Sequence, residues 1–125
     1  MAFLGDLLEK LARPPQELRA EHLREWAASV PGAIPIADAE SRCSCKLAGV
    51  IQNVRIDPRE GTGSIEATIF DGTGLLVVKW LGRQKLSGIR LGAGLILEGT
   101  VGEGRSKQLQ VLNPEYQLLP APEHG

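Results

Sequence analysis

The sequence has few of the residues on which most catalytic sites depend. Its 125 residues include two histidines, and aromatic side chains make up 4% of the chain. His22 lies in the N-terminal region and His124 next to the last residue, so neither can be combined with a serine or cysteine nucleophile around a central pocket. We therefore expect no catalytic residues and a protein that is not an enzyme.

Cysteine is equally scarce, since Cys43 and Cys45 are the only two. Two thiolates do not complete the ligand set of a structural zinc site, and the sequence offers no second pair. Residues two apart on a strand point the same way and lack the geometry for an easy mutual disulfide. We expect buried or half-buried free thiols in a reducing compartment. The glycine clusters do not follow the strand and helix pattern of a dinucleotide site, so no metal and no cofactor is expected.

Long apolar runs are also missing, because no stretch approaches the ~20 residues that cross a bilayer. The first six residues lack the basic and then apolar order of a signal peptide. The sequence therefore predicts a cytoplasmic protein with no membrane partner.

What the chain does contain is typical of a folded β-protein. Hydrophobic residues make up 42% and charged residues 23%, which is enough for one core. The 15 glycines favour many turns and short strands. The net charge of −1 is unevenly spread. Residues 1–41 carry four basic and seven acidic side chains, whereas residues 42–118 carry ten basic and seven acidic ones. The second segment therefore has the sign that phosphate groups favour.

Residues 1–32 are predicted to form an N-terminal helical hairpin. Leucines at 4, 7, 8 and 11 form one apolar stripe, which Pro14-Pro15 ends. Leu18, His22, Leu23, Trp26 and Val30 then mark one face of a second helix, as far as Pro31-Gly32. These helices either cover one end of the following domain or pair with another chain. Residues 33–41 are assigned as a linker.

Residues 42–119 are predicted to form one β-domain, followed by a flexible tail at 120–125. Gly49 in the first strand is expected to allow a bulge or a sharp coil. The segment from Gly82 to Leu91 is too polar and too rich in glycine for a strand, so a helical turn or loop crossing one end of a barrel is expected there. Five strands are expected, over residues 43–51, 65–70, 75–81, 95–101 and 109–111.

Five strands, a bent first strand and a non-strand segment between the third and fourth match the order of elements in an OB-fold. The strings that carry a resemblance are Gly49-Val50, Asp71-Gly72-Thr73-Gly74, Lys79-Trp80-Leu81-Gly82-Arg83, Gly99-Thr100-Val101 and Asn113-Pro114-Glu115-Tyr116. Over about residues 46–118 the chain resembles small stand-alone actinobacterial OB-fold nucleic-acid-binding proteins, and it is similar to the OB (wedge) domain of RecG-type helicases. This resemblance implies a mainly β fold, a five-stranded OB-fold barrel, and nucleic-acid binding.

The turn Asp71-Gly72-Thr73-Gly74 sets which side chains face a ligand. If it joins Phe70 directly to Leu75, Ile69 pairs with Leu76. The inward side chains are then Ile65, Ala67, Ile69, Leu76, Val78 and Trp80. The outward side chains are Glu66, Thr68, Phe70, Leu75, Val77 and Lys79. A slip of one residue would reverse the two sets, so Trp80 is either a core residue or a platform for base stacking.

The candidate nucleic-acid-binding residues are one ring and seven cations. An OB barrel binds single strands on the outer face of its second and third strands, by stacking and by phosphate contacts. Each cation also has an ordinary explanation as a solvated surface charge. The candidates are Arg55, Phe70, Lys79, Arg83, Lys85, Arg90, Arg105 and Lys107.

Two functions of different classes follow from these patterns. The first is weak, sequence-tolerant binding of single-stranded DNA or RNA, with a role in DNA repair or recombination. The second is a protein-interaction or dimerisation module. In that case the N-terminal helices, or the apolar patch of Phe70, Leu75 and Val77, dock a protein partner or a second copy in a homodimer.

Overall fold

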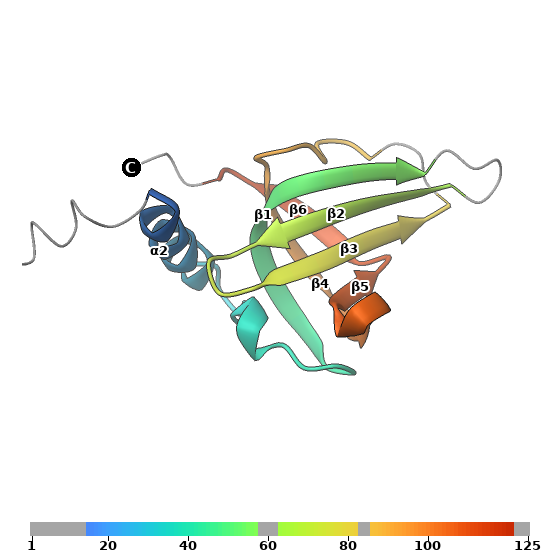
Figure 1. Ribbon diagram of the computed structural model, residues 1–125, viewed down its shortest axis with the longest axis horizontal. Coiled ribbons are helices and arrows are strands. Elements are labelled where there is room, and N and C mark those ends of the chain that lie inside the picture. Colours follow the sequence, from blue (N-terminus) through green and yellow to red (C-terminus); the bar gives the residue numbers. More distant parts are fainter. Residues whose placement is uncertain (1–14, 58–62, 83–85, 122–125) are drawn as a thin grey trace, which may run out of the picture.

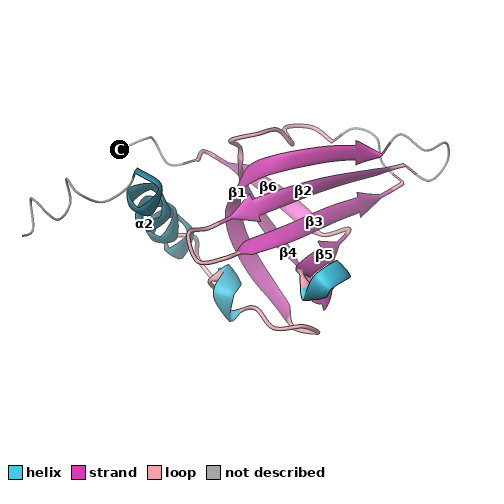
Figure 2. Ribbon diagram, in the orientation of Figure 1, coloured by secondary structure: helices cyan, strands magenta, loops and turns pink. Residues whose placement is uncertain are grey.

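The computed structural model describes residues 15–57, 63–82 and 86–121. One helix is followed by a short 3-10 turn and six strands (Figure 1). The strands β2 and β3 lie nearest the viewer in Figure 1, and β4 and β6 pass behind them. Figure 2 shows that the helical segments lie at the margins of a body made of strands. The elements are α2 (Pro15–Ala28), η1 (Ile36–Asp38), β1 (Ser44–Asp57), β2 (Ser64–Phe70), β3 (Leu75–Leu81), β4 (Gly94–Glu103), η2 (Arg105–Lys107), β5 (Leu109–Leu112) and β6 (Glu115–Leu119).

Five of the strands close into a ring. The first half of β1 pairs with β4 and its second half with β2, so one long strand belongs to both sides of the barrel. Antiparallel pairing then continues from β2 to β3, and β5 lies parallel to β3 and antiparallel to β4. This closed ring confirms the predicted five-stranded OB-fold barrel.

The strand β1 bends to serve both sides, but the bend differs from the prediction. The register with β2 shifts between Ile51 and Asn53, which places the bulge at Gln52 rather than at Gly49. Gly49 instead allows a close approach of two strands. A Cβ atom at that position would lie 3.1 Å from the side chain of Ile69, closer than ordinary van der Waals contact.

The core confirms the predicted register of the β2–β3 hairpin. Ile69 pairs with Leu76 and Ile65 with Trp80, as the turn implied. All six residues of the predicted inward set are buried, with at most 4% of each exposed. Trp80 is therefore a core residue. Its indole N–H donates to the Pro114 carbonyl at 3.2 Å, and its ring meets Tyr116 edge-on at a centroid distance of 5.4 Å.

One end of the barrel is covered by the segment that was assigned as a linker. Ile36, in η1, is 1% exposed and belongs to the barrel core. Its backbone N–H donates to Asp71 Oδ2 at 2.8 Å. The other Asp71 oxygen accepts from the backbone N–H of Thr73 and of Gly74 and from the Thr73 hydroxyl, at 2.8, 3.1 and 2.6 Å. The buried Asp71 therefore shapes its own turn and also holds η1 against it.

The segment predicted as a helical turn or loop, Gly82 to Leu91, covers part of the barrel as a loop over its described residues 86–91. Leu86 and Ile89 are half-buried and pack against the core. The Tyr116 hydroxyl donates to the Ser87 carbonyl at 3.3 Å and so fixes the loop beside β6. No helix in the described ranges is long and apolar enough to cross a membrane.

The predicted helical hairpin is not shown. The described residues 15–57 contain one helix, α2, and the expected first helix lies outside the described part of the chain. The apolar face of α2 packs on the barrel of the same chain, because Leu23 and Ala27 are buried. Ala27, together with the buried Val30 just after the helix, packs against Ala48 of β1. His22, expected on this face, is exposed. A face already covered by the same chain gives no support to a homodimer through the N-terminal helices.

The C-terminal part of the barrel contains a sixth strand that the sequence did not predict. β6 pairs with the first half of β4, and β5 pairs with its end, so β5 and β6 follow the same edge of β4 in turn. Asn113-Pro114 lies between them, and Asn113 adopts a positive φ of 50°. The side-chain oxygen of Asn113 accepts a hydrogen bond from the backbone N–H of Leu81 at 2.8 Å. The backbone N–H of Asn113 donates to the Lys79 carbonyl at 2.7 Å. The segment between β5 and β6 is therefore hydrogen-bonded to β3.

Replacement of Asp71 tests the importance of its hydrogen bonds. Asp71→Ala leaves a buried cluster of donors without an acceptor, and we expect it to lower the free energy of unfolding by about 2–4 kcal/mol. Urea denaturation followed by circular dichroism measures the change. Asp38→Ala, at an exposed carboxylate in η1, is the matched control and should change the stability by less than about 0.5 kcal/mol. Equal effects of the two substitutions would contradict the assigned role.

Candidate nucleic-acid interface

Charged side chains form a row across three neighbouring strands on the outer face of the barrel. Arg55 of β1 is the register partner of Glu66 in β2, and Glu66 is the partner of Lys79 in β3. Residues directly opposite each other in antiparallel strands project to the same side of the sheet. The row therefore runs perpendicular to the strands, with a carboxylate between two cations.

This row lies in a groove of about 620 Å³. The groove crosses from β1 over β2 and β3 to β5, and the η2 turn forms one of its sides. The strands β2 and β3 that form its floor face the viewer in Figure 1. The residues that line it are Arg55, Ile56, Asp57, Ser64, Glu66, Val77, Lys79, Gly104, Arg105, Gln108 and Gln110.

The η2 turn is held in place by its own hydrogen bonds. The Gly104 N–H donates to the Gln108 carbonyl at 2.7 Å, and the Gln108 side-chain amide donates to the Leu75 carbonyl at 3.1 Å. Ser106 and Lys107 adopt positive φ angles of 57° and 61°, which reverses the chain within a few residues. This turn fixes the backbone of Arg105 at the side of the groove.

The groove carries a small excess of positive charge. Arg55, Lys79 and Arg105 contribute three cations, and Asp57 and Glu66 contribute two carboxylates. The contact between Arg55 and Glu66 is long, at 3.9 Å, and the Arg55 side chain is 77% exposed. An exposed pair of this length is weak, so the guanidinium is available to a ligand. Such a surface attracts phosphates moderately.

The structure brings together three of the eight predicted site residues. Arg55, Lys79 and Arg105 line the groove. Lys107 is exposed on η2 beside Arg105, but it does not line the groove. Arg90 lies elsewhere, in the loop before β4 that lines a different hollow with Leu118. Arg83 and Lys85 lie outside the described residues.

Phe70 is separate from the charged row, although it lies on the same face of β2. It is half-buried at the last position of β2, opposite the exposed Leu75. Four residues of extended strand separate it from Glu66, which is about 13 Å. None of the described residues that line the groove is aromatic. Stacking on Phe70 would therefore need a ligand that extends along β2 beyond the row.

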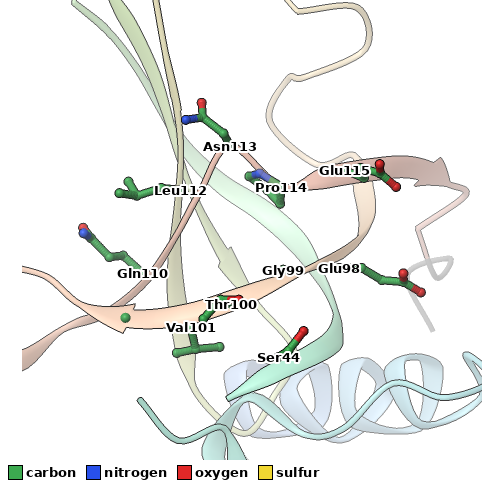
Figure 3. A pocket seen from close by; sticks show the side chains of 11 residues that line it. Ser44, Glu98, Gly99, Thr100, Val101, Gln110, Leu112, Asn113, Pro114 and Glu115 are labelled. Carbon is green, nitrogen blue, oxygen red and sulfur yellow. The ribbon is translucent and has the colours of Figure 1, made fainter. Parts of the chain in front are cut away.

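A second hollow, on β4, is unsuitable for phosphate. Figure 3 shows Glu98 and Glu115 at one side of it and Gln110, Leu112 and Asn113 along another. Its volume is also about 620 Å³, but the described residues that line it include two glutamates and no basic residue. The groove on β2 and β3 therefore suits an anionic strand better than this hollow does.

The two cysteines have the environment of structural thiols. Both are free and half-buried. Burial raises the pKa of the Cys45 thiol, and the neighbouring Cys43 raises it further. A raised pKa disfavours the reactive thiolate. Within the described ranges no three or more His, Cys, Asp or Glu side chains gather as metal ligands would.

Sequence patterns located the outer face but missed several side chains that line the groove. Alternation in the sequence placed Glu66 on the outer face, but no function was predicted for it. Gln108 and Gln110 line the groove because β5 pairs in parallel with β3. This pairing places Gln110 opposite Val77. Parallel pairing between strands far apart in the sequence leaves no local signal in either strand.

Comparisons with known proteins identify the fold. No protein-family model matches the sequence, and no curated protein matches it. Many solved structures resemble the chain, among them the three that follow. The OB domain of a Methanosarcina mazei protein has a TM-score of 0.59 at 22% identity, over 76% of this chain and 91% of that one. RecG bound to a three-way DNA junction has a TM-score of 0.58 at 19% identity, over 74% of this chain. An OBody bound to hen egg-white lysozyme has a TM-score of 0.57 at 14% identity, over 75% of this chain and all of that one.

These similarities confirm the OB-fold that the sequence predicted, including the resemblance to the OB domain of RecG. The chain spans 13% of the RecG chain, so the similarity concerns one domain of a larger protein. At identities of 22% or less it concerns the fold alone.

Replacement of Trp80 tests the separation of core and binding face. Trp80→Phe removes the donor to the Pro114 carbonyl and part of the core volume, and we expect a loss of about 1–2 kcal/mol in the free energy of unfolding. Because Trp80 points inwards, the affinity for single strands should stay within about twofold, as measured by fluorescence anisotropy below the unfolding transition. A large loss of affinity in the folded variant would contradict the inward assignment.

Proposed function

We propose that this OB-fold protein binds single-stranded DNA or RNA weakly, through the groove on β2 and β3, and tolerates most sequences. The observation that carries the proposal is the set of Arg55, Lys79 and Arg105 in one groove on the face where OB barrels bind single strands. The proposed activity is binding rather than catalysis.

The proposed binding is weak because charge and stacking are both limited. The groove has three cations against two carboxylates, and Phe70 is the single ring described on the outer face of β2 and β3. Phosphate contacts contribute most of a non-specific affinity, and they weaken as salt rises. A role in DNA repair or recombination is part of the proposal, and the RecG domain seen with a DNA junction supports it.

A second function has one observation in its favour. Phe70, Leu75 and Val77 form an apolar strip on the outer face, and Leu75 is 46% exposed. The similar OBody is bound to a protein, lysozyme. A protein ligand would use the apolar strip, whereas a nucleic acid would use the charged row.

The first test is a salt titration of a labelled single strand of about 20 nucleotides. Three phosphate contacts predict a slope of about −2 for the logarithm of the association constant against the logarithm of the salt concentration. Raising salt from 50 to 200 mM should therefore weaken binding roughly 15-fold. Lys79→Glu and Arg105→Glu should each lower the affinity and flatten the slope. Arg90→Glu, outside the groove, is the matched control, and the proposal fails if it has the same effect or if no strand binds at low salt.

The second test asks whether Phe70 stacks on a base. Phe70→Leu keeps an apolar side chain and removes the ring, and we expect the affinity for a single strand to fall by about five- to 100-fold. The same variant should leave association with a protein partner nearly intact, because an apolar strip needs no ring. Unchanged affinity for the strand would confine nucleic-acid binding to the charged row.

A further inference from the structure

Glu66 is at odds with a surface that only binds phosphate. It is a carboxylate in the middle of the row, with Arg55 on one side and Lys79 on the other, and 29% of its side chain is exposed. The Arg55 guanidinium lies 3.9 Å from its carboxylate. A phosphate placed over Glu66 would be repelled, and yet the flanking cations attract phosphates to either side.

An ionised carboxylate accepts hydrogen bonds and donates none. The part of a nucleic acid that lies over Glu66 must therefore present N–H or O–H donors. In RNA the ribose 2′-hydroxyl is one such donor. The phosphates and deoxyribose rings within a DNA strand have none, so the base edge is the part of a DNA strand that fits. In a single strand the pairing edge of a base is open to such a contact.

The pairing edges of the bases differ in the order of their donors and acceptors. Guanine presents two adjacent donors, N2–H and N1–H, followed by the acceptor O6. Glu66 supplies two acceptor oxygens, and the Lys79 ammonium, directly opposite on β3, supplies a donor beside them. Cytosine and adenine each have one amino donor on this edge. Thymine and uracil have a single N–H between two carbonyl oxygens, so they leave one carboxylate oxygen against an acceptor.

We propose that Glu66 and Lys79 together read one base of the bound strand, with guanine preferred and thymine or uracil disfavoured. This inference rests on the proposed function, because it concerns the same groove. Arg55 and Arg105 then hold phosphates on either side, and the Lys79 ammonium, which has three N–H donors, contacts a phosphate as well as the base. The rest of the strand is left free of sequence requirements.

The experiment uses the full chain and labelled DNA strands of about 12 nucleotides. One strand contains thymine alone, and others carry a single guanine, adenine or cytosine at the centre, in lithium buffer to suppress guanine assemblies. A two-donor contact predicts that the guanine strand binds about five- to 100-fold more tightly than the thymine strand. Hypoxanthine in place of guanine lacks the N2 amino group and should lose most of this preference. 7-Deazaguanine keeps the pairing edge and should retain it.

The substitution Glu66→Gln separates base reading from simple repulsion. It keeps the size of the side chain, removes its charge and turns one acceptor into a donor. We expect the affinity for the thymine strand to rise and the ratio between guanine and thymine strands to fall towards one. Glu98→Gln removes the same charge from an exposed position on β4, outside the groove, and should leave the ratio unchanged.

The outcomes separate this inference from the proposed function. No binding of any strand at low salt overturns both. Binding of all strands with equal affinity overturns the inference alone. If Glu66→Gln raises the affinity for every strand equally, Glu66 only repels phosphate. If the variant changes no affinity, Glu66 only pairs with Arg55. Either result overturns the base-reading role.

Discussion

The buried carboxylate of Asp71 is the interaction on which the arrangement of the barrel depends. It lies at the turn between β2 and β3, and it accepts hydrogen bonds from that turn and from η1. The first set fixes the length of the turn and therefore the register of the two strands. The second brings Ile36 into the end of the barrel. The Asp71 side chain therefore both shapes the β2–β3 turn and helps to close the end of the core.

Register is what separates core from ligand face in this protein. With Ile69 opposite Leu76, every second residue of β2 and β3 enters the core and the others face outwards. A shift of one residue would bury Glu66 and Lys79 and expose Trp80, which would cost several kcal/mol for the two charges alone. The same hydrophobic pattern that drives folding therefore also places the charged row on the surface. Stability and the candidate interface are specified by the same residues.

The sequence predicted best those features that depend on neighbours along the chain. Alternation in residues 65–69 and the turn at Asp71 predicted both strands, and they placed Trp80 in the core if the turn joins Phe70 directly to Leu75, an alternative that the structure settles. Ile36 was missed because it lies next to Pro35 in a short irregular segment, and its burial depends on a hydrogen bond to a residue 35 positions away. β6 was missed because a proline precedes it, and its pairing with β4 is also distant in sequence. The groove was predicted in part, because Arg55 and Lys79 come from antiparallel strands that follow one another in the sequence, whereas Gln110 depends on the parallel pairing of β5.

The packing of α2 has a consequence for the way this domain can be attached to other molecules. The indole N–H of Trp26, near the end of α2, donates to the Pro120 carbonyl at 3.0 Å, so segments 94 positions apart in the sequence meet at one place. In Figure 1 this place is at the side of the barrel where α2 lies, whereas β2 and β3 reach the opposite side at Ser64 and Leu81. A surface, a bead or a second domain joined through either segment would therefore meet the barrel away from the Ser64 and Leu81 ends of β2 and β3, near which the groove lies.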